Sequence, residues 1–170
     1  MIWGVISWIP ATYTLTSMYL CAHPTDISLP YSAVLIVLGL LFLYINYEAD
    51  LQKQVTRRTN GQSMIWGRKP SILKAKYQTS DGNLRESILL VDGYWKFSRH
   101  FHYVPEILLT LCWTLPAGFS NFVPWYYFFQ LTGLLIDRTI RDETRCKLKY
   151  GKTWDEYCKL NKYRIIPFVF

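Results

Sequence analysis

Two basic residues that could bind a phosphate group lie shortly after an uncharged run of the sequence, Ile27 to Tyr47. Lys53 and Arg57 are four residues apart, so a helix would place both side chains on one face. The lysine ammonium is a point charge, and the planar guanidinium of arginine can donate hydrogen bonds to two phosphate oxygens at once. The pair therefore indicates an anion site, although cations at the end of a membrane helix also serve as simple positive-inside anchors.

A second cluster joins cations to aromatic rings between Trp95 and Tyr103, in the run WKFSRHFHY. Aromatic side chains beside cations can stack a planar ring such as adenine or nicotinamide. The simpler interpretation is an aromatic belt at a membrane interface. His100 and His102 are two residues apart, which points them to opposite sides of a helix, so the sequence does not predict a metal-binding pair.

A third cluster lies near the end of the chain, in the run RDETRCKLKYG at 141–151, which WDEYC follows at 154–158. Its residues recur every three or four positions, which predicts one face of a helix. The residues that recur are Arg138, Asp142, Cys146, Lys149 and Tyr150. Gly151 would end that helix, and Thr153 with Glu156 would start another as a capping box. A solvated amphipathic helix with ordinary ion pairs is the simpler interpretation of this cluster.

Several familiar sites are excluded by missing motifs. The sequence has no G-x-G-x-x-G, no G-x-x-x-x-G-K-[ST] and no G-x-S-x-G. It therefore signals neither a Rossmann or P-loop nucleotide site nor a nucleophile elbow. The cysteines are widely spaced without a C-x-x-C pair, so we interpret them as free thiols rather than disulfide partners or zinc ligands. They are Cys21, Cys112, Cys146 and Cys158.

The distribution of charge indicates a membrane protein. All 19 Lys and Arg residues lie between Lys53 and Arg164, and aromatic residues make up 17% of the chain. The first 52 residues therefore suit lipid or the exoplasmic side, and the basic remainder suits the cytoplasmic side and anionic lipid. The basic residues alternate with apolar runs and match no nucleic-acid reader, so we expect membrane lipid and no nucleic acid as a partner.

Apolar runs predict the elements that carry these clusters. Ile27 to Tyr47 is long enough to span a bilayer, and Trp3 to Leu20 is a weaker candidate. Ile107 to Ile136 is uncharged but contains two prolines, which predicts a helical hairpin with arms at 105–117 and 123–137, tilted or re-entrant.

The polar segment between these runs carries a hairpin signal. The runs Ser71–Tyr77 and Leu84–Val91 flank the turn residues 80–83, which include Asp-Gly. The predicted fold is thus an all-α multi-pass membrane protein with about four transmembrane or re-entrant helices, a small cytoplasmic β-hairpin and a C-terminal amphipathic helical tail. Its parts are membrane helices at 1–48, a cytoplasmic cofactor segment at 49–103, the helical hairpin at 104–137 and a cytoplasmic cofactor-binding tail at 138–170.

Three stretches resemble the membrane sterol reductases, which include the C14 and C24(28) reductases of ergosterol biosynthesis. They are RDETRCKLKYGKTWDEYCKLNKYRIIP, LLVDGYWKFSRHFHYVPEI and YINYEADLQKQVTRRTNGQSMIWGRKP. The last is most similar to members that reduce the Δ7 double bond. The resemblance covers essentially the whole chain, but members are more than twice as long. It therefore implies the C-terminal half of the enzyme domain.

The resemblance implies NADPH as hydride donor and assigns residues to it one by one. The positions that match cofactor contacts in the family are Lys53, Arg57, Leu90, Trp95, His102, Tyr103, Asp142, Cys146, Lys147, Lys149, Tyr150 and Tyr157. His102 departs from animal members, which have Asn there. Tyr157 is the expected proton donor, and Asp142 is expected to hold the nicotinamide amide or to relay protons.

The implied activity is NADPH-dependent reduction of a sterol ring double bond in sterol biosynthesis, of the 7-dehydrocholesterol to cholesterol type. The implied partners are the sterol, membrane lipid and a separate N-terminal half of the enzyme, without which the chain could be inactive. The implied location is the endoplasmic reticulum membrane in a eukaryote or the inner membrane in a bacterium.

Two other functions stay open at this point. The isoprenylcysteine carboxyl methyltransferases share an R-H-x-x-Y run and a similar C-terminal tail, but they carry Pro where this chain has Phe101. A non-catalytic sterol-binding or scaffold protein is the second alternative, because such a protein could keep the fold and lose the proton donor.

Overall fold

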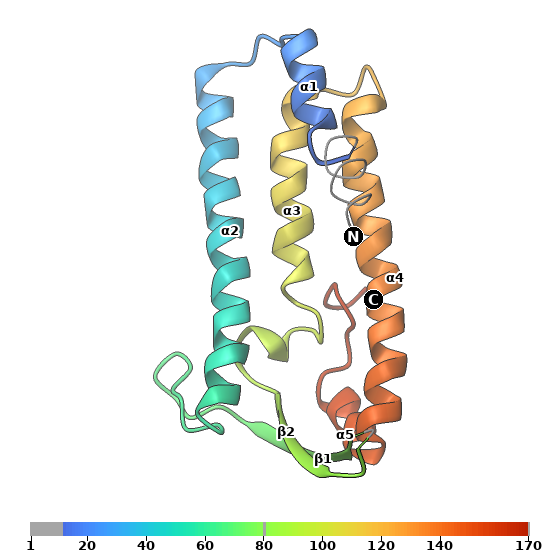
Figure 1. The fold of residues 1–170 in the computed structure, drawn as a ribbon. Helices are drawn as coiled ribbons and strands as arrows, with labels where there is room; N and C mark the ends of the chain where they lie inside the picture. The colour runs from blue at the N-terminus through green and yellow to red at the C-terminus, as the bar shows by residue number, and fades with distance from the viewer. Residues whose placement is uncertain (1–11, 80, 170) are drawn as a thin grey trace. The chain divides into compact units, whose positions relative to one another are not determined.

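The computed structural model describes residues 12–79 and 81–169, and these are mostly helical (Figure 1). The α-helices are α1 (Leu15–Ala22), α2 (Leu29–Arg58), α3 (Tyr103–Thr114), α4 (Tyr126–Tyr150) and α5 (Lys152–Leu160). The strands are β1 (Ile72–Gln78) and β2 (Leu84–Leu90), and short 3-10 turns are η2 (Gly93–Lys96), η3 (Leu115–Ala117) and η4 (Val123–Trp125). The chain forms two compact units, one of residues 1–44 and 105–135 and one of residues 45–104 and 136–170.

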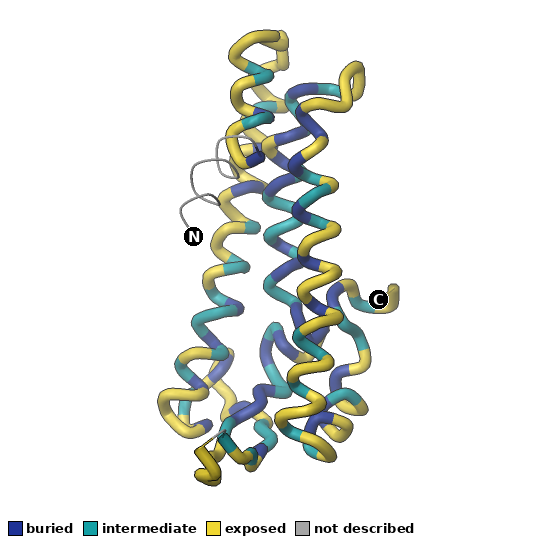
Figure 2. The backbone as a smooth tube through the Cα atoms, turned by 45° about the vertical axis from the view of Figure 1, so that its right-hand side comes forward, coloured by how far each residue is buried: buried dark blue, intermediate teal, exposed yellow. Residues whose placement is uncertain are grey.

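Helix α2 contains the run that the sequence predicts as the strongest membrane span. Among the described residues it is the one helix long and apolar enough to cross a membrane, and only 11% of its most apolar window is buried. Most residues in the first half of α2 are exposed (Figure 2). The helix continues to Arg58 without a break, so Lys53 and Arg57 belong to it.

The weaker span predicted from Trp3 to Leu20 lies partly outside the described residues. Its described end forms the eight-residue helix α1, which is too short to cross a bilayer. Helix α1 packs on the turns η3 and η4. The buried hydroxyl of Thr16 donates a hydrogen bond to the carbonyl of Pro124 at 2.8 Å.

The predicted helical hairpin is confirmed as α3 and α4. The two prolines stand in η3 and η4, where their missing N–H groups cost no helical hydrogen bond. Helix α4 is longer than the predicted arm, because it runs on through residue 137 to Tyr150 and includes the helix predicted at 138–150. Helix α4 therefore contains both the predicted apolar arm and the third polar cluster.

The predicted β-hairpin is also confirmed. Strands β1 and β2 pair antiparallel, with Ala75 opposite Ser87. The backbone N–H of Gly82 donates to the carbonyl of Thr79 at 2.9 Å in the turn; Ser80 lies outside the described residues. One face of the hairpin packs on α5, where Ala75 and Leu89 form a buried cluster with Trp154 and Tyr157. Burial of this face fixes the register of the two strands.

The predicted capping box at Thr153 is wrong. Helix α5 begins at Lys152, directly after Gly151, and no side chain caps it. Gly151 has φ +52°, a conformation that glycine adopts without the steric cost of a Cβ. The chain therefore reverses at a single residue between α4 and α5, and Thr153 already lies in the first turn of α5.

Candidate functional site

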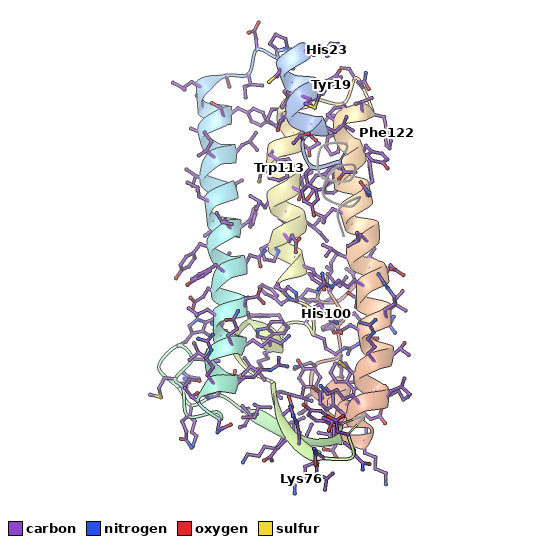
Figure 3. All side chains as sticks on the ribbon, viewed as in Figure 1. Tyr19, His23, Lys76, His100, Trp113 and Phe122 are labelled. Atoms are coloured by element: carbon purple, nitrogen blue, oxygen red, sulfur yellow. The ribbon has the colours of Figure 1, made fainter. Side chains whose placement is uncertain are left out.

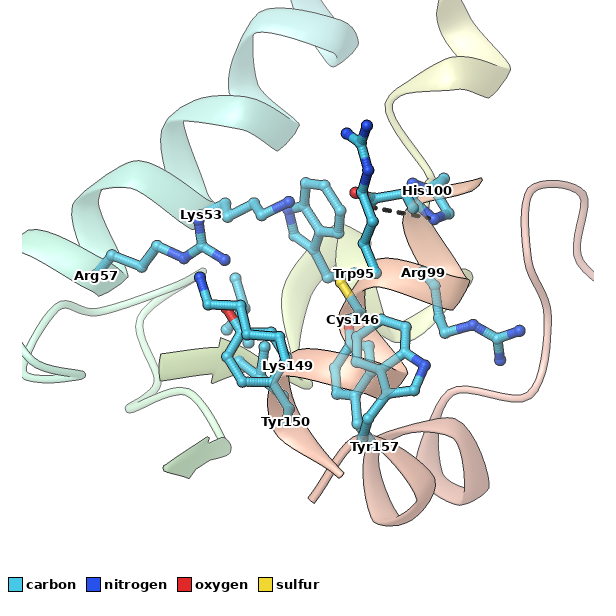
Figure 4. A pocket seen from close by; sticks show the side chains of 14 residues that line it. Lys53, Arg57, Trp95, Arg99, His100, Cys146, Lys149, Tyr150 and Tyr157 are labelled. Carbon is cyan, nitrogen blue, oxygen red and sulfur yellow. Dashed lines mark ion pairs between the residues drawn. The ribbon is translucent and has the colours of Figure 1, made fainter. Parts of the chain in front are cut away.

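A pocket of about 380 Å³ lies inside the second unit (Figure 4). Five segments form its walls: one face of α2, the end of β2, the turn from η2 to α3, one face of α4, and α5. This volume is at the lower end of the range for small-molecule sites, about 300–1,000 Å³. A ligand the size of a dinucleotide would fill the pocket and extend beyond it.

Trp95 forms one wall of the pocket because hydrogen bonds hold η2 against α2. Trp95 is only 1% exposed, and its indole N–H donates to the carbonyl of Ala49 at 2.8 Å. The backbone N–H of Tyr94 donates to Oε1 of Gln52 at 3.2 Å. Gly93 has φ +65°, and a Cβ there would clash with Gln52 Oε1, so only glycine allows this close approach. These contacts hold the Trp95 ring beside Lys53, whose Nζ lies 3.9 Å from the ring centroid.

Helix α4 presents the polar face that its spacing predicts. Asp142, Arg145, Cys146 and Lys149 all line the pocket. Lys149 Nζ lies 4.0 Å from the ring centroid of Tyr77 on β1, which places this ammonium beside the hairpin. Burial raises the pKa of the Cys146 thiol to about 11, so it lines the pocket as a neutral group.

The pocket carries an excess of positive charge. Its lining side chains include five cations, namely Lys53, Arg57, Arg99, Arg145 and Lys149, but one carboxylate, Asp142. Burial, reinforced by the neighbouring Arg57, lowers the pKa of Lys53 to about 8. An anion bound here would raise the pKa of Lys53 again, because a nearby opposite charge favours the charged form of the ammonium. The charge distribution thus favours an anionic ligand.

Aromatic rings line the same pocket. Trp95 stands by α2, Tyr150 ends α4, and Trp154 and Tyr157 lie on α5. The rings of Trp154 and Tyr157 stack with centroids 5.1 Å apart. Tyr157 is buried, and this burial raises the pKa of its phenol to about 12. The pocket therefore combines cations for an anion with flat apolar surfaces for a ring.

Arg99 fastens the C-terminal segment to the wall of the pocket. Its Nε donates to Oε1 of Glu143 at 2.9 Å, and Nη2 pairs with the same oxygen. Its Nη1 donates to the carbonyls of Asn161 and Lys162 at 2.6 and 3.0 Å. Arg164 completes the network through a 2.8 Å bond from its Nε to Oε2 of Glu143. Arg99 thus joins α4, the end of α5 and the turn before α3.

The two histidines do not lie on a helix, which corrects the prediction that they point to opposite sides. They belong to the turn before α3, and their ring centroids are 6.2 Å apart. Burial lowers the pKa of His100 to about 4 and that of His102 to about 3. Both rings are therefore neutral near pH 7. Nε2 of His100 lies 4.0 Å from Oδ2 of Asp142 (Figure 4).

The structure brings nine of the twelve predicted cofactor residues to this pocket. They are Lys53, Arg57, Leu90, Trp95, Asp142, Cys146, Lys149, Tyr150 and Tyr157. His102, Tyr103 and Lys147 do not line it. The His102 ring packs on Trp95 at a centroid distance of 5.1 Å and on Tyr103 at 4.1 Å. His102 and Tyr103 therefore lie behind Trp95 and do not face the pocket. Lys147 is one residue beyond Cys146 on α4, so it turns away and faces Asp155 at 3.8 Å.

Five lining residues were not among the predicted site residues: Leu89, Arg99, His100, Arg145 and Trp154. Arg145 was predictable, because it lies three residues after Asp142 on the same helical face. The other four depend on how the turn and α5 fold back on α4, which local spacing does not reveal. Within the described part of the chain, no three His, Cys, Asp or Glu side chains are grouped so as to hold a metal ion.

Fold and pocket together define a class of protein: mostly helical, with a candidate membrane span and a basic, aromatic-lined pocket. The whole chain, residues 1–170, matches the Ergosterol biosynthesis ERG4/ERG24 family. The chain belongs to this family, which confirms the resemblance drawn from its sequence.

Relatives with assigned names match almost the entire chain. It is 48% identical to a 7-dehydrocholesterol reductase of Arabidopsis thaliana over 99% of the chain and 39% of that relative. It is 39% identical to a 7-dehydrocholesterol reductase of Danio rerio over 99% of the chain and 35% of that relative. It is 35% identical to a Delta(14)-sterol reductase of Mus musculus over 100% of the chain and 38% of that relative. The chain thus spans less than two-fifths of these relatives' length.

Proposed function

We propose that this chain forms the NADPH-binding part of a membrane oxidoreductase that reduces the Δ7 double bond of a sterol ring. The observation that carries the proposal is the pocket, where cations from α2 and α4 face a buried tryptophan. Family membership and the names of the relatives support the reaction class, because those proteins are sterol reductases. The same membership favours a reductase over the methyltransferase that the R-H-x-x-Y run also suggested.

The residues present fit NADPH. Lys53 and Arg57 would hold the 2′-phosphate, while Arg145 and Lys149 supply further positive charge for the diphosphate. Trp95 offers a flat ring surface for the base or the nicotinamide. When bound, NADPH supplies the hydride that the sterol carbon accepts. The protein's part is to bind it, hold it in line and exclude water.

We assign the proton of the reaction to Tyr157, with Asp142 as the group that relays protons or holds the nicotinamide amide. A phenol with a raised pKa stays protonated near pH 7, so Tyr157 always carries the proton it must give. It is also a weak acid, and donation needs nearby positive charge. Arg99 and Arg57 provide it, since both lower the pKa of Tyr157 against the effect of burial.

The substrate of the proposed enzyme reaches it through lipid. An apolar sterol dissolves in the membrane that α2 is suited to cross, whereas NADPH approaches from water. We therefore place the chain in a multi-pass membrane protein, in the endoplasmic reticulum of a eukaryote or the inner membrane of a bacterium. The rest of that protein, or a separate N-terminal half, would complete the sterol site.

The pH dependence of NADPH binding gives a first prediction. Affinity should fall by up to about 10-fold as the pH rises from 7 to 9, because Lys53 loses its proton through a pKa of about 8 and only its protonated fraction can pair with the phosphate. The two histidines titrate far below this window and Cys146 above it. The 2′-phosphate is already doubly charged.

Calorimetric titrations at each pH measure the effect, and Lys53→Arg should abolish it. A flat profile in the unsubstituted chain would remove Lys53 from the phosphate site.

A chimera tests the proposed reaction. This chain replaces the matching segment of the Arabidopsis relative, and turnover of a 7-dehydrosterol is followed by the loss of its conjugated-diene absorbance. We expect NADPH-dependent turnover that falls at least about 100-fold in Tyr157→Phe, with NADPH binding still measurable. Normal turnover by the phenylalanine variant would remove Tyr157 from the proton path. NADPH binding without any turnover by the unsubstituted chimera would favour the non-catalytic alternative.

A further inference from the structure

His100 occupies a position in the pocket that the proposed function leaves unused. Its side chain is buried, and its Nε2 atom has no hydrogen-bond partner. An unsatisfied buried polar atom costs about 1–3 kcal/mol and calls for an explanation. Because the Nε2 atom is also sealed from solvent, a partner must come from a neighbouring protein group.

The position of the His100 ring is fixed by its surroundings. Its backbone N–H donates to the carbonyl of Arg164 at 2.9 Å. The imidazole stacks on Tyr103 with a centroid distance of 5.4 Å and an angle of 8° between the planes. The preceding residue, Arg99, is anchored by Glu143. The ring therefore has little freedom to move toward a partner.

Asp142 is the acceptor that can approach His100. Oδ2 of Asp142 lies 4.0 Å from Nε2 of His100, which is too long for a hydrogen bond and about 1 Å beyond a good one. The Asp142 side chain is half exposed, whereas that of His100 is 7% exposed. The carboxylate is thus the mobile partner, and a small rotation would bring it to the ring. Such bonds are often long before a ligand binds and shorten in the complex.

We propose that His100 is a positioning residue: its Nε2–H fixes one oxygen of Asp142, so that the other oxygen accepts an N–H from the carboxamide of a bound nicotinamide. A carboxylate held on one side by a rigid donor presents its second oxygen in a defined direction. This inference rests on the proposed function, because it requires a nicotinamide cofactor in this pocket. It adds a residue that recognises the amide through Asp142.

Three ligands separate this role from a structural one. NADPH has the complete carboxamide, the reduced 3-acetylpyridine analogue keeps the carbonyl but lacks the NH₂ group, and 2′,5′-ADP lacks the nicotinamide altogether. His100→Phe, which keeps a flat ring but loses Nε2, should weaken NADPH binding about 10- to 100-fold, the loss of one charge-assisted hydrogen bond. Binding of the analogue and of 2′,5′-ADP should not change. His100→Gln, whose amide can donate to Asp142, should restore most of the NADPH affinity.

A double-mutant cycle completes the test on the full chain, by calorimetric titration. Asp142→Ala should show the same selectivity for ligands as His100→Phe, and the double variant should lose no more than Asp142→Ala alone. Equal weakening of all three ligands by His100→Phe, an unchanged Kd for NADPH, or additive losses in the double variant would each overturn the role of His100. If the unsubstituted chain binds neither NADPH nor 2′,5′-ADP, the proposed function itself fails.

Discussion

Replacing Arg99 with Ala should lower the free energy of unfolding by about 3 kcal/mol, because it breaks a buried ion pair, although Arg164 still pairs with Glu143. The Arg99 and Glu143 side chains are 6% and 15% exposed. The substitution also leaves the carbonyls of Asn161 and Lys162 without this donor. Denaturant titration in mixed micelles, followed by circular dichroism, measures the change.

Arg141→Ala is the matched control for Arg99→Ala. It removes an arginine from the same region and breaks an ion pair with Asp137 at 2.6 Å, in which both side chains are more than 60% exposed. Surface pairs of this kind contribute at most about 1 kcal/mol. If Arg99→Ala costs no more than this control, the network does not hold the C-terminal segment in place. Faster proteolysis after residue 160 in Arg99→Ala alone would support the anchoring role.

Trp95→Ala should lower the free energy of unfolding by about 3–5 kcal/mol and also abolish measurable NADPH binding. Trp95 is almost completely buried, and its truncation leaves a large cavity between η2 and α2. The ring is also the surface on which Lys53 rests, so its loss frees the ammonium from its position at the phosphate site. The same denaturant titration and a calorimetric NADPH titration give the two effects.

Trp95→Phe separates the ring from its N–H group. It keeps an aromatic surface and loses the hydrogen bond to Ala49, with an expected cost of about 1–2 kcal/mol. NADPH binding should weaken and remain measurable. If Trp95→Ala binds NADPH as tightly as the unsubstituted chain, the aromatic wall has no part in the site, whatever the loss of stability.

The sequence predicted the parts of the site that depend on helical periodicity. Lys53 and Arg57 share a face of α2, and Asp142, Cys146 and Lys149 share a face of α4, because residues three or four apart are neighbours on a helix. Two runs that flank an Asp-Gly turn predicted the hairpin in the same way. These features are local, so each could be predicted from a single segment of the sequence.

The parts that escaped prediction depend on contacts between distant segments. Arg99 meets Glu143 and the carbonyls near residue 161, over 40 and 60 residues away, and no local pattern encodes such a meeting. The helical assumption for His100 and His102 failed because both lie in the turn between η2 and α3. The capping box at Thr153 failed because Gly151 reverses the chain in one residue.

The most direct test of the account is the preference of the purified full chain for NADPH over NADH. The two cofactors differ only in the 2′-phosphate that Lys53 and Arg57 are proposed to bind. Lys53→Ala/Arg57→Ala removes two positive charges from the pocket. Lys74→Ala/Lys76→Ala removes two from the face of β1 turned away from α5, where Lys76 points outward (Figure 3).

Calorimetric titration should show NADPH binding at least about tenfold tighter than NADH, as one charge-assisted contact to phosphate requires. The preference should disappear in Lys53→Ala/Arg57→Ala and persist in Lys74→Ala/Lys76→Ala. Equal affinity for the two cofactors in the unsubstituted chain, or equal loss in both double variants, would contradict the assignment of this pocket to NADPH.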